Sequence, residues 1–255
     1  MKIIDTLLQE VSSVMEEARP VEVAIGAYWT LVTLGHRAAL YAGLSSTLGG
    51  GDEHHHGKGY PVRDCGQLLH LPLSQLAALA HSENLLEASV GLATINALLS
   101  INPQPGVELN AADIVAERGA GKRVAIVGHF PFIERIRKLA QTLWVLELRP
   151  HDGDEPSERA PELLPQADVV ALTGTALLNG TFESLLAHCR SDAYVLVLGG
   201  TTPLSTAFFD LGIAAVSGTQ VIDVAAARDS ILQGATYRQI AGKLPLTLFP
   251  PAGGF

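Results

Sequence analysis

Polar residues that could bind a ligand follow short apolar runs in the second half of this chain. The runs begin near residues 124, 143, 169, 194 and 213. Continuous apolar runs are typical of buried parallel strands, whose carboxyl ends form the ligand-binding edge of an open α/β sheet. The residues expected at that edge include Gly128, His129, Glu147, Gly199, Thr201 and Thr202.

Two of these residues have side chains suited to chemistry. His129 follows the first run, where it could be a metal ligand or a proton carrier, or could make a structural hydrogen bond. Glu147 ends the second run, roughly 20 residues past Gly128, which is the position of the ribose-binding acid in dinucleotide-binding folds. No G-x-G-x-x-G follows the first run, so NAD is disfavoured.

Two acidic or histidine-rich loops could hold a cation. His54, His55 and His56 stand next to acidic residues, and imidazole with carboxylate suits transition metals. Consecutive side chains rarely converge on one ion, so a solvated surface tract is an equal alternative. Asp154 lies in an acidic, proline-rich stretch, 149–165, which binds a cation or keeps the loop soluble.

Asn96 is unusual because it lies inside an otherwise apolar helical segment. A buried Asn without partners is unfavourable. It could reach across a domain interface into the ligand crevice, or it could satisfy a loop carbonyl. Cys65 and Cys189 are expected to be structural, without a disulfide, which suits a reducing cytoplasm.

The elements that must position these residues form two modules. An amphipathic helix opens the chain, followed by a hairpin over 21–34, a third strand over 37–45 and helices over 73–80 and 85–100. This pattern indicates a small α+β domain over residues 1–110, ending in a Pro/Gly linker at 101–110. Residues 111–255 then form a parallel-sheet domain.

The predicted order of the parallel strands is 3-2-1-4-5, with the runs numbered along the chain. The first and fourth strands then flank the point where the order reverses, which places Gly128, His129 and Phe130 opposite residues 199–202. The crossover over 149–165 contains four prolines and cannot be a full helix. A crossover without its helix is a candidate functional loop.

Composition narrows the class of ligand. The chain has 255 residues, 47% of them apolar, and a formal net charge of −9. These values exclude general disorder and argue against sequence-independent nucleic-acid binding. No run reaches the roughly 18 apolar residues of a membrane span, so no membrane insertion is expected. We expect a cytoplasmic protein that binds small molecules or cations. A homodimer is a further expectation that no motif supports.

Five motifs together resemble the DUF4213/DUF364 family, labelled "putative heavy-metal chelation". They are SVGLATINALL, KRVAIVGHFP, VLELRPHDGD, ADVVALTGTALLNGTFESLL and GGTTPLSTAFFDLG. The resemblance implies an enolase-N-terminal-like domain, a Rossmann-like domain and a site in the cleft between them. The positions that it implies are Asn96, His129, Glu147, Asp154, Thr173, Thr175, Asn179, Thr181, Thr202 and Pro203. One departure is Gly200, where the family's loop usually has proline.

These observations support three expectations of function. The first is a protein that binds a transition metal (nickel, cobalt, iron or zinc) or a small chelating metabolite in an interdomain cleft. The second is an S-adenosylmethionine- or nucleotide-dependent enzyme of metabolite biosynthesis, with His129, Glu147 and Asn96 as candidate catalytic residues. The third is a noncatalytic partner in a metal-uptake system. A shared fold does not decide among them.

Overall fold

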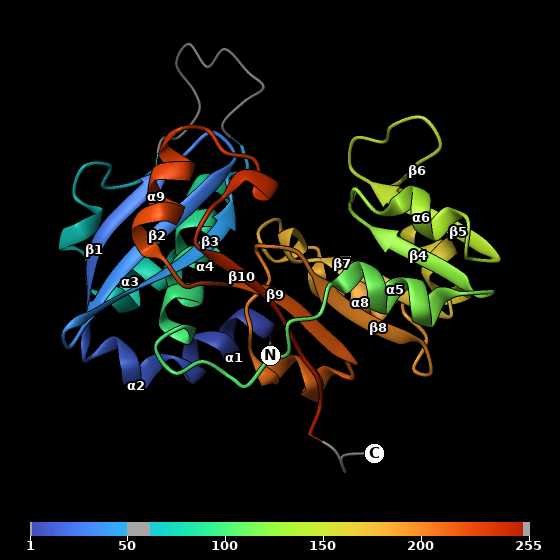
Figure 1. Ribbon diagram of the computed structural model, residues 1–255, viewed down its shortest axis with the longest axis horizontal. Coiled ribbons are helices and arrows are strands. Elements are labelled where there is room, and N and C mark those ends of the chain that lie inside the picture. Colours follow the sequence, from blue (N-terminus) through green and yellow to red (C-terminus); the bar gives the residue numbers. More distant parts are fainter. Residues whose placement is uncertain (1, 50–61, 252–255) are drawn as a thin grey trace.

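The computed structural model describes residues 2–49 and 62–251, which form two β-sheets with helices around them (Figure 1). The strands are β1 (Ala18–Ile25), β2 (Trp29–His36), β3 (Ala39–Ser46), β4 (Arg123–Val127), β5 (Thr142–Glu147), β6 (Glu155–Pro156), β7 (Val169–Thr173), β8 (Tyr194–Leu198), β9 (Ala215–Val221) and β10 (Lys243–Leu248). The α-helices are α1 (Ile3–Glu10), α2 (Ser12–Met15), α3 (Leu73–Ala78), α4 (Leu85–Leu99), α5 (Ala111–Gly119), α6 (Ile133–Arg137), α7 (Ala160–Leu163), α8 (Phe182–Ala187) and α9 (Val224–Leu232). The 3-10 helices are η1 (Leu68–His70), η2 (Leu79–His81), η3 (Ser157–Arg159), η4 (Leu164–Gln166), η5 (Gly174–Leu177), η6 (Thr206–Leu211) and η7 (Tyr237–Gln239).

The first sheet is an antiparallel meander in the order β1-β2-β3, as the predicted hairpin and third strand require. Helix α4 packs on it at backbone distance, since a Cβ on Gly43 of β3 would lie 2.2 Å from the backbone nitrogen of Ala97. Every residue of α4 from Glu87 to Leu99 is buried. A helix that is apolar on all sides suits such a central position. The close approach of α4 to β3 places Asn96 beside the carbonyl of Leu44.

The second sheet has the order β10-β9-β8-β7-β4-β5-β6, and only β10 is antiparallel to its neighbour among the described strands. Its side chains alternate between two cores. Val124 and Ile126 pack with α5 and α6, whereas Ala125 and Val127 belong to the cluster that contains residues of α7 and α8. The predicted fold class, a small α+β part followed by a mostly parallel sheet, is confirmed.

The observed strand order corrects the expected position of the reversal point. The prediction numbered the run at 169 as the third strand and the run at 194 as the fourth. In the structure the third strand is β6, two residues long, inside the proline-rich crossover, so the run at 169 is β7 and pairs with β4. The reversal therefore lies between β4 and β7. Gly128 lies beside Thr173, not opposite residues 199–202 as predicted.

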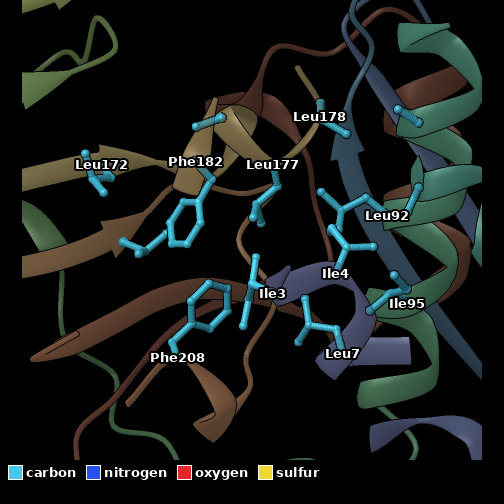
Figure 2. Packing of buried hydrophobic residues seen from close by; sticks show 14 of the residues in the cluster. Ile3, Ile4, Leu7, Leu92, Ile95, Leu172, Leu177, Leu178, Phe182 and Phe208 are labelled. Atoms are coloured by element: carbon cyan, nitrogen blue, oxygen red, sulfur yellow. The ribbon is translucent and has the colours of Figure 1, made fainter. Parts of the chain in front are cut away.

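Helix α1 joins the two parts of the molecule. Its buried residues Ile3, Ile4 and Leu7 belong to a core cluster that draws on both sheets. Figure 2 shows them between Leu92 and Ile95 of α4 on one side and Phe182 and Phe208 on the other. The backbone N–H of Ile3 also donates to Oε1 of Glu183 at 3.1 Å. The predicted amphipathic helix thus buries its apolar stripe between the sheets.

The end of the chain returns to the first sheet. The Asp223 side chain caps α9, and α9 packs Ala227 and Ile231 against Leu31 and Leu44. The predicted linker runs beside β10, where Val107 forms an isolated antiparallel bridge with Thr247. The domain boundary at 110/111 stays a prediction.

The 3-10 helix η6 follows the loop after β8. It begins at Thr206, where the Ser205 side chain caps it, and it ends before Gly212, which has φ 79°. Within the described ranges, no helix combines the length and apolar character needed to span a bilayer.

Candidate functional site

The carboxyl ends of the parallel strands place several of the predicted residues along one edge of the second sheet. Gly128 and His129 follow β4, Glu147 ends β5, and Thr173 ends β7. Gly128 has φ 107°, and a Cβ there would lie 3.0 Å from Cβ of Thr173 and 3.1 Å from the Phe130 ring. Only glycine allows β4 and β7 to end so close together at the reversal point.

An imidazole–carboxylate cluster is the most distinctive feature of this edge. Nδ1 of His129 lies 3.0 Å from Oδ2 of Asp154, and the same oxygen accepts the backbone N–H of His151 at 3.1 Å. The Asp154 side chain is only 2% exposed, whereas that of His129 is 44% exposed. A hydrogen bond from Nδ1 to the carboxylate needs the ring proton on Nδ1, and in that tautomer the lone pair of Nε2 can bind a ligand.

His151 is the functional candidate that the sequence interpretation missed. Its ring centroid lies 5.0 Å from that of His129, with the planes at 71°. A tight turn brings it there, since the N–H of Asp154 donates to the carbonyl of His151 and Gly153 has φ 88°. The motif His-Asp-Gly-Asp at 151–154 carried the signal, because glycine between two turn-forming aspartates favours such a turn.

The predicted metal ligands are only partly assembled. His129 and Asp154 are in contact, but Asp154 is placed to orient the imidazole. Among the residues that the structure describes, no group of three or more His, Cys, Asp or Glu side chains could hold a metal ion together. His54, His55 and His56 lie outside the described residues. The cluster therefore offers two imidazoles and an orienting carboxylate.

Hydroxyl groups stand beside this cluster, at the end of β7. Oγ1 of Thr173 and Oγ1 of Thr175 lie 2.9 Å apart, and both residues are half-buried. Asn179 and Thr181 form a separate local turn, in which Oδ1 of Asn179 accepts the hydroxyl of Thr181 at 2.7 Å and its N–H at 3.2 Å. The first pair borders Gly128; the second stabilises the entry to α8.

Glu147 is half-buried at the end of β5, one residue past Leu146, which pairs with Val127 of β4. Its Oε2 accepts the backbone N–H of Leu148 at 3.1 Å. Within residues 2–49 and 62–251, no hydrogen bond to its Oε1 is found. The structure therefore keeps Glu147 at the edge, but it does not join Glu147 to His129 by a hydrogen bond.

The remaining predicted residues lie where the two sheets meet. Nδ2 of Asn96 donates to the carbonyls of Leu44 (2.7 Å) and Thr201 (3.1 Å), and the Thr201 hydroxyl bonds to Ser46 through N–H (3.0 Å) and Oγ (2.9 Å). Thr201 is 1% exposed. Both alternatives for Asn96 are met in part, because its amide nitrogen reaches across to the loop after β8 and satisfies carbonyl groups there and in β3. These residues hold β3, α4 and the loop after β8 together.

Among the residues that the structure describes, neither Oδ1 of Asn96 nor Oγ1 of Thr202, both buried at this junction, has a hydrogen-bond partner. Thr202 lies against Gly174, where a Cβ would come within 2.4 Å of that hydroxyl. A Cβ on Gly199, in the same loop, would lie 3.9 Å from the Phe130 ring. The loop after β8 is therefore packed from several sides.

Gly200, the departure from the family's proline, has a direct physical reason. A Cβ there would lie 2.5 Å from the Tyr237 ring and 2.8 Å from Trp29. These two rings contact each other with centroids 5.3 Å apart. The aromatic pair occupies the space that a proline ring would need. The packing of Trp29 and Tyr237 on Gly200 therefore restrains this turn.

Comparison with protein families identifies the chain. A model of DUF364, described as "Putative heavy-metal chelation", matches residues 110–249, and a model of DUF4213 with the same description matches residues 9–99. The chain belongs to the DUF4213/DUF364 family.

Similar proteins support the fold of this DUF4213/DUF364 member. A crystal structure of a DUF364 protein of unknown function from Pyrococcus horikoshii is 17% identical, with a TM-score of 0.81 over 98% of this chain and 100% of that one. A crystal structure of a second DUF364 protein of unknown function, from Desulfitobacterium hafniense, is 23% identical, with a TM-score of 0.75 over 96% of this chain and 99% of that one. An uncharacterized protein of Methanocaldococcus jannaschii is 29% identical over 160 residues; this match spans 60% of the chain and 61% of the relative's length.

Proposed function

We propose that this protein binds a transition-metal ion at the edge of the second sheet, with His129 and His151 as donors and Asp154 as the carboxylate that orients His129. The observation that carries the proposal is the hydrogen bond from the exposed His129 ring to the buried Asp154 side chain. Metal-binding histidines usually donate their other ring N–H to a carboxylate in this way. Nickel, cobalt, zinc and iron all accept imidazole donors.

The spacing of the two rings supports the same function. In tetrahedral coordination with metal–nitrogen distances of about 2.0–2.1 Å, two ring centroids lie about 5 Å apart. The centroids of His129 and His151 are 5.0 Å apart. Two imidazoles leave further coordination positions open. A small oxygen-rich chelator would fill them, and the hydroxyls of Thr173 and Thr175 would orient it. The bound metal would supply a site that recognises the chelator through its donor atoms.

Calorimetric titration with nickel, cobalt, zinc and iron(II) tests this proposal. All variants carry alanine at positions 54, 55 and 56, so that the histidine tract cannot bind the ion. We expect saturable binding that His129→Ala weakens about 100-fold, because a direct ligand and its orienting contact are both lost. His70→Ala is the matched control, since His70 is exposed and bonds only locally to Gln67. Equal affinity in the two variants would refute the proposal.

A second candidate function, binding of a nucleoside-containing ligand such as S-adenosylmethionine, is favoured by Glu147. Its position at the end of β5, beside the reversal point, is that of the ribose-binding acid. A ligand that binds only the folded state raises the melting temperature. We expect S-adenosylmethionine to produce such a shift, and Glu147→Gln to abolish it. A shift that survives in Glu147→Gln, or no shift at all, would eliminate this candidate.

A further inference from the structure

A groove of about 500 Å³ lies in the first part of the molecule, away from the strand-end cluster. It is bordered by α2, the turn between β2 and β3 and the residues that follow α4. Strand β3 starts here at Ala39 and ends at Ser46, which contacts Thr201. Seven residue steps of strand correspond to roughly 23 Å. None of the residues that line the groove belongs to the strand-end cluster, and its volume is typical of small-molecule sites.

The turn at the rim of this groove holds Arg37 in an unfavourable backbone conformation. Two residues, Arg37 and Ala38, connect the paired His36 and Ala39, and Arg37 has φ 53°. Turns of this length favour Gly, Asn or Asp at positive φ, because a larger side chain crowds its own backbone. A residue held in such a conformation is a reason to look for a function.

The guanidinium of Arg37 has hydrogen-bonding capacity available. It is 79% exposed, and its ion pair with Glu17 has an Nη2–Oε2 distance of 3.6 Å, too long for a hydrogen bond. Glu17 instead accepts from Nε2 of the buried His36 at 3.2 Å. That hydrogen bond, and then the charge of Arg37, lower the pKa of Glu17, so its carboxylate is ionised at neutral pH.

Apolar side chains line the same groove. Val14 and Tyr41 are half-buried, and Ile101 is buried at 8% exposure. A planar cation at the rim above an apolar lining suits an amphipathic anion, because the fork of arginine N–H groups matches a carboxylate with two parallel hydrogen bonds.

We propose that this groove binds a small organic carboxylate with an apolar body. Arg37 would bind the carboxylate, and the body would pack on Val14, Tyr41 and Ile101. Glu17 would set the affinity, because its negative charge lies beside the anion's position.

Titration calorimetry with phenylacetate as the probe tests this site. We expect saturable binding by the wild-type protein and at least about tenfold weaker binding by Arg37→Gly, since the bidentate contact is lost. The same variant should melt at a higher temperature, because glycine adopts positive φ without strain. A higher melting temperature also shows that the variant is folded. Arg238→Ala, which removes an exposed arginine elsewhere, should bind like the wild type.

Glu17→Gln tests the sign of the ligand's charge. Glutamine can still accept the hydrogen bond from His36 but carries no negative charge, so phenylacetate should bind more tightly. Weaker binding in this variant would overturn the assignment of an anionic ligand. Absence of saturable binding by the wild type, or unchanged affinity in Arg37→Gly, would overturn the site itself.

Discussion

Two nearly buried carboxylates, Glu87 in α4 and Asp154 at the strand-end edge, have very different surroundings. The side chains are 3% and 2% exposed. Glu87 accepts the backbone N–H of Arg63 at 2.7 Å, bonds from its guanidinium, and the Ser82 hydroxyl at 2.6 Å. The negative charge of Glu87 is thus balanced by a fixed cation within the fold.

Asp154 is balanced differently. Its described partners are the His129 ring and the backbone N–H of His151, both at Oδ2. The charge of Asp154 therefore acts on the exposed His129 ring, and through the ring on a ligand bound to Nε2. The two carboxylates are equally buried, but Glu87 contributes to stability, whereas in our proposal Asp154 contributes to ligand binding. The partner of a buried carboxylate, more than its burial, indicates its role.

The largest effect is expected from Glu87→Gln. Hydrogen bonds from Arg63 lower the pKa of Glu87 to about 2, below the ordinary value near 4.5. The ionised group therefore contributes stability above about pH 4.5, and this contribution is lost as the pH falls towards 2. We expect the variant to lose about 3 kcal/mol of unfolding free energy at pH 7, and much less at pH 3, in urea titrations.

Glu83→Gln, the same change at an exposed position, is the matched control and should alter stability by less than about 0.5 kcal/mol. If Glu87→Gln behaves like this control at pH 7, the Arg63 pair is not structural and the contrast with Asp154 disappears.

Asp154→Asn should give the next largest effect, on binding instead of folding. Loss of an orienting carboxylate typically weakens metal binding about 10- to 100-fold, or about 1.4–2.7 kcal/mol. We expect this loss for nickel by calorimetry, with unfolding free energy within about 1 kcal/mol of the wild type. Asp152→Asn, exposed in the same turn, should change neither quantity. A large loss of stability with intact nickel binding would reverse the roles of the two carboxylates.

The junction between the sheets should respond to Thr201→Val. Valine keeps the shape but removes the hydroxyl that accepts the Ser46 N–H, so a buried donor loses its partner. Such a loss is expected to cost about 1–2 kcal/mol of unfolding free energy, measured in urea. Thr206→Val, at an exposed position at the start of η6, is the control. Weakened nickel binding in Thr201→Val, at unchanged stability, would move Thr201 from the junction to the site.

Most of the second sheet could be predicted from the sequence because its strands are continuous apolar runs with recognisable caps. The helix caps Asn110 of α5 and Asp223 of α9 are of residue types that favour helix starts. Strand β6 was missed, since two residues that include a proline carry no periodic signal. That short strand shifted the reversal point by one strand. The paths of α1 and α9 across the junction also lay beyond prediction, because they depend on tertiary packing.

The candidate site divides along similar lines. The strand-end positions of His129 and Glu147 followed from the apolar runs that precede them, whereas Thr173 was a position that the family resemblance implied. The contact of His129 with Asp154 did not, because 25 residues separate them and a turn set by Gly153 brings them together. Sequence pattern also could not separate the exposed His129 from the buried Thr201, since both follow strands in similar polar motifs.

The smallest effect is expected from Thr173→Val, which separates binding of the metal from binding of its chelator. Thr173 shares a hydrogen bond with Thr175 beside Gly128, but within residues 2–49 and 62–251 neither side chain forms a hydrogen bond with the imidazoles. Nickel alone should therefore bind Thr173→Val as it binds the wild type. Nickel presented as its citrate complex should bind about 2- to 5-fold more weakly, because one neutral hydrogen bond contributes about 0.5–1 kcal/mol. Thr175→Val should resemble it, whereas Thr181→Val, in the separate turn with Asn179, should not. Equal weakening of both forms of nickel would place Thr173 in the support of the imidazoles, and the edge would then be a single site for the bare ion.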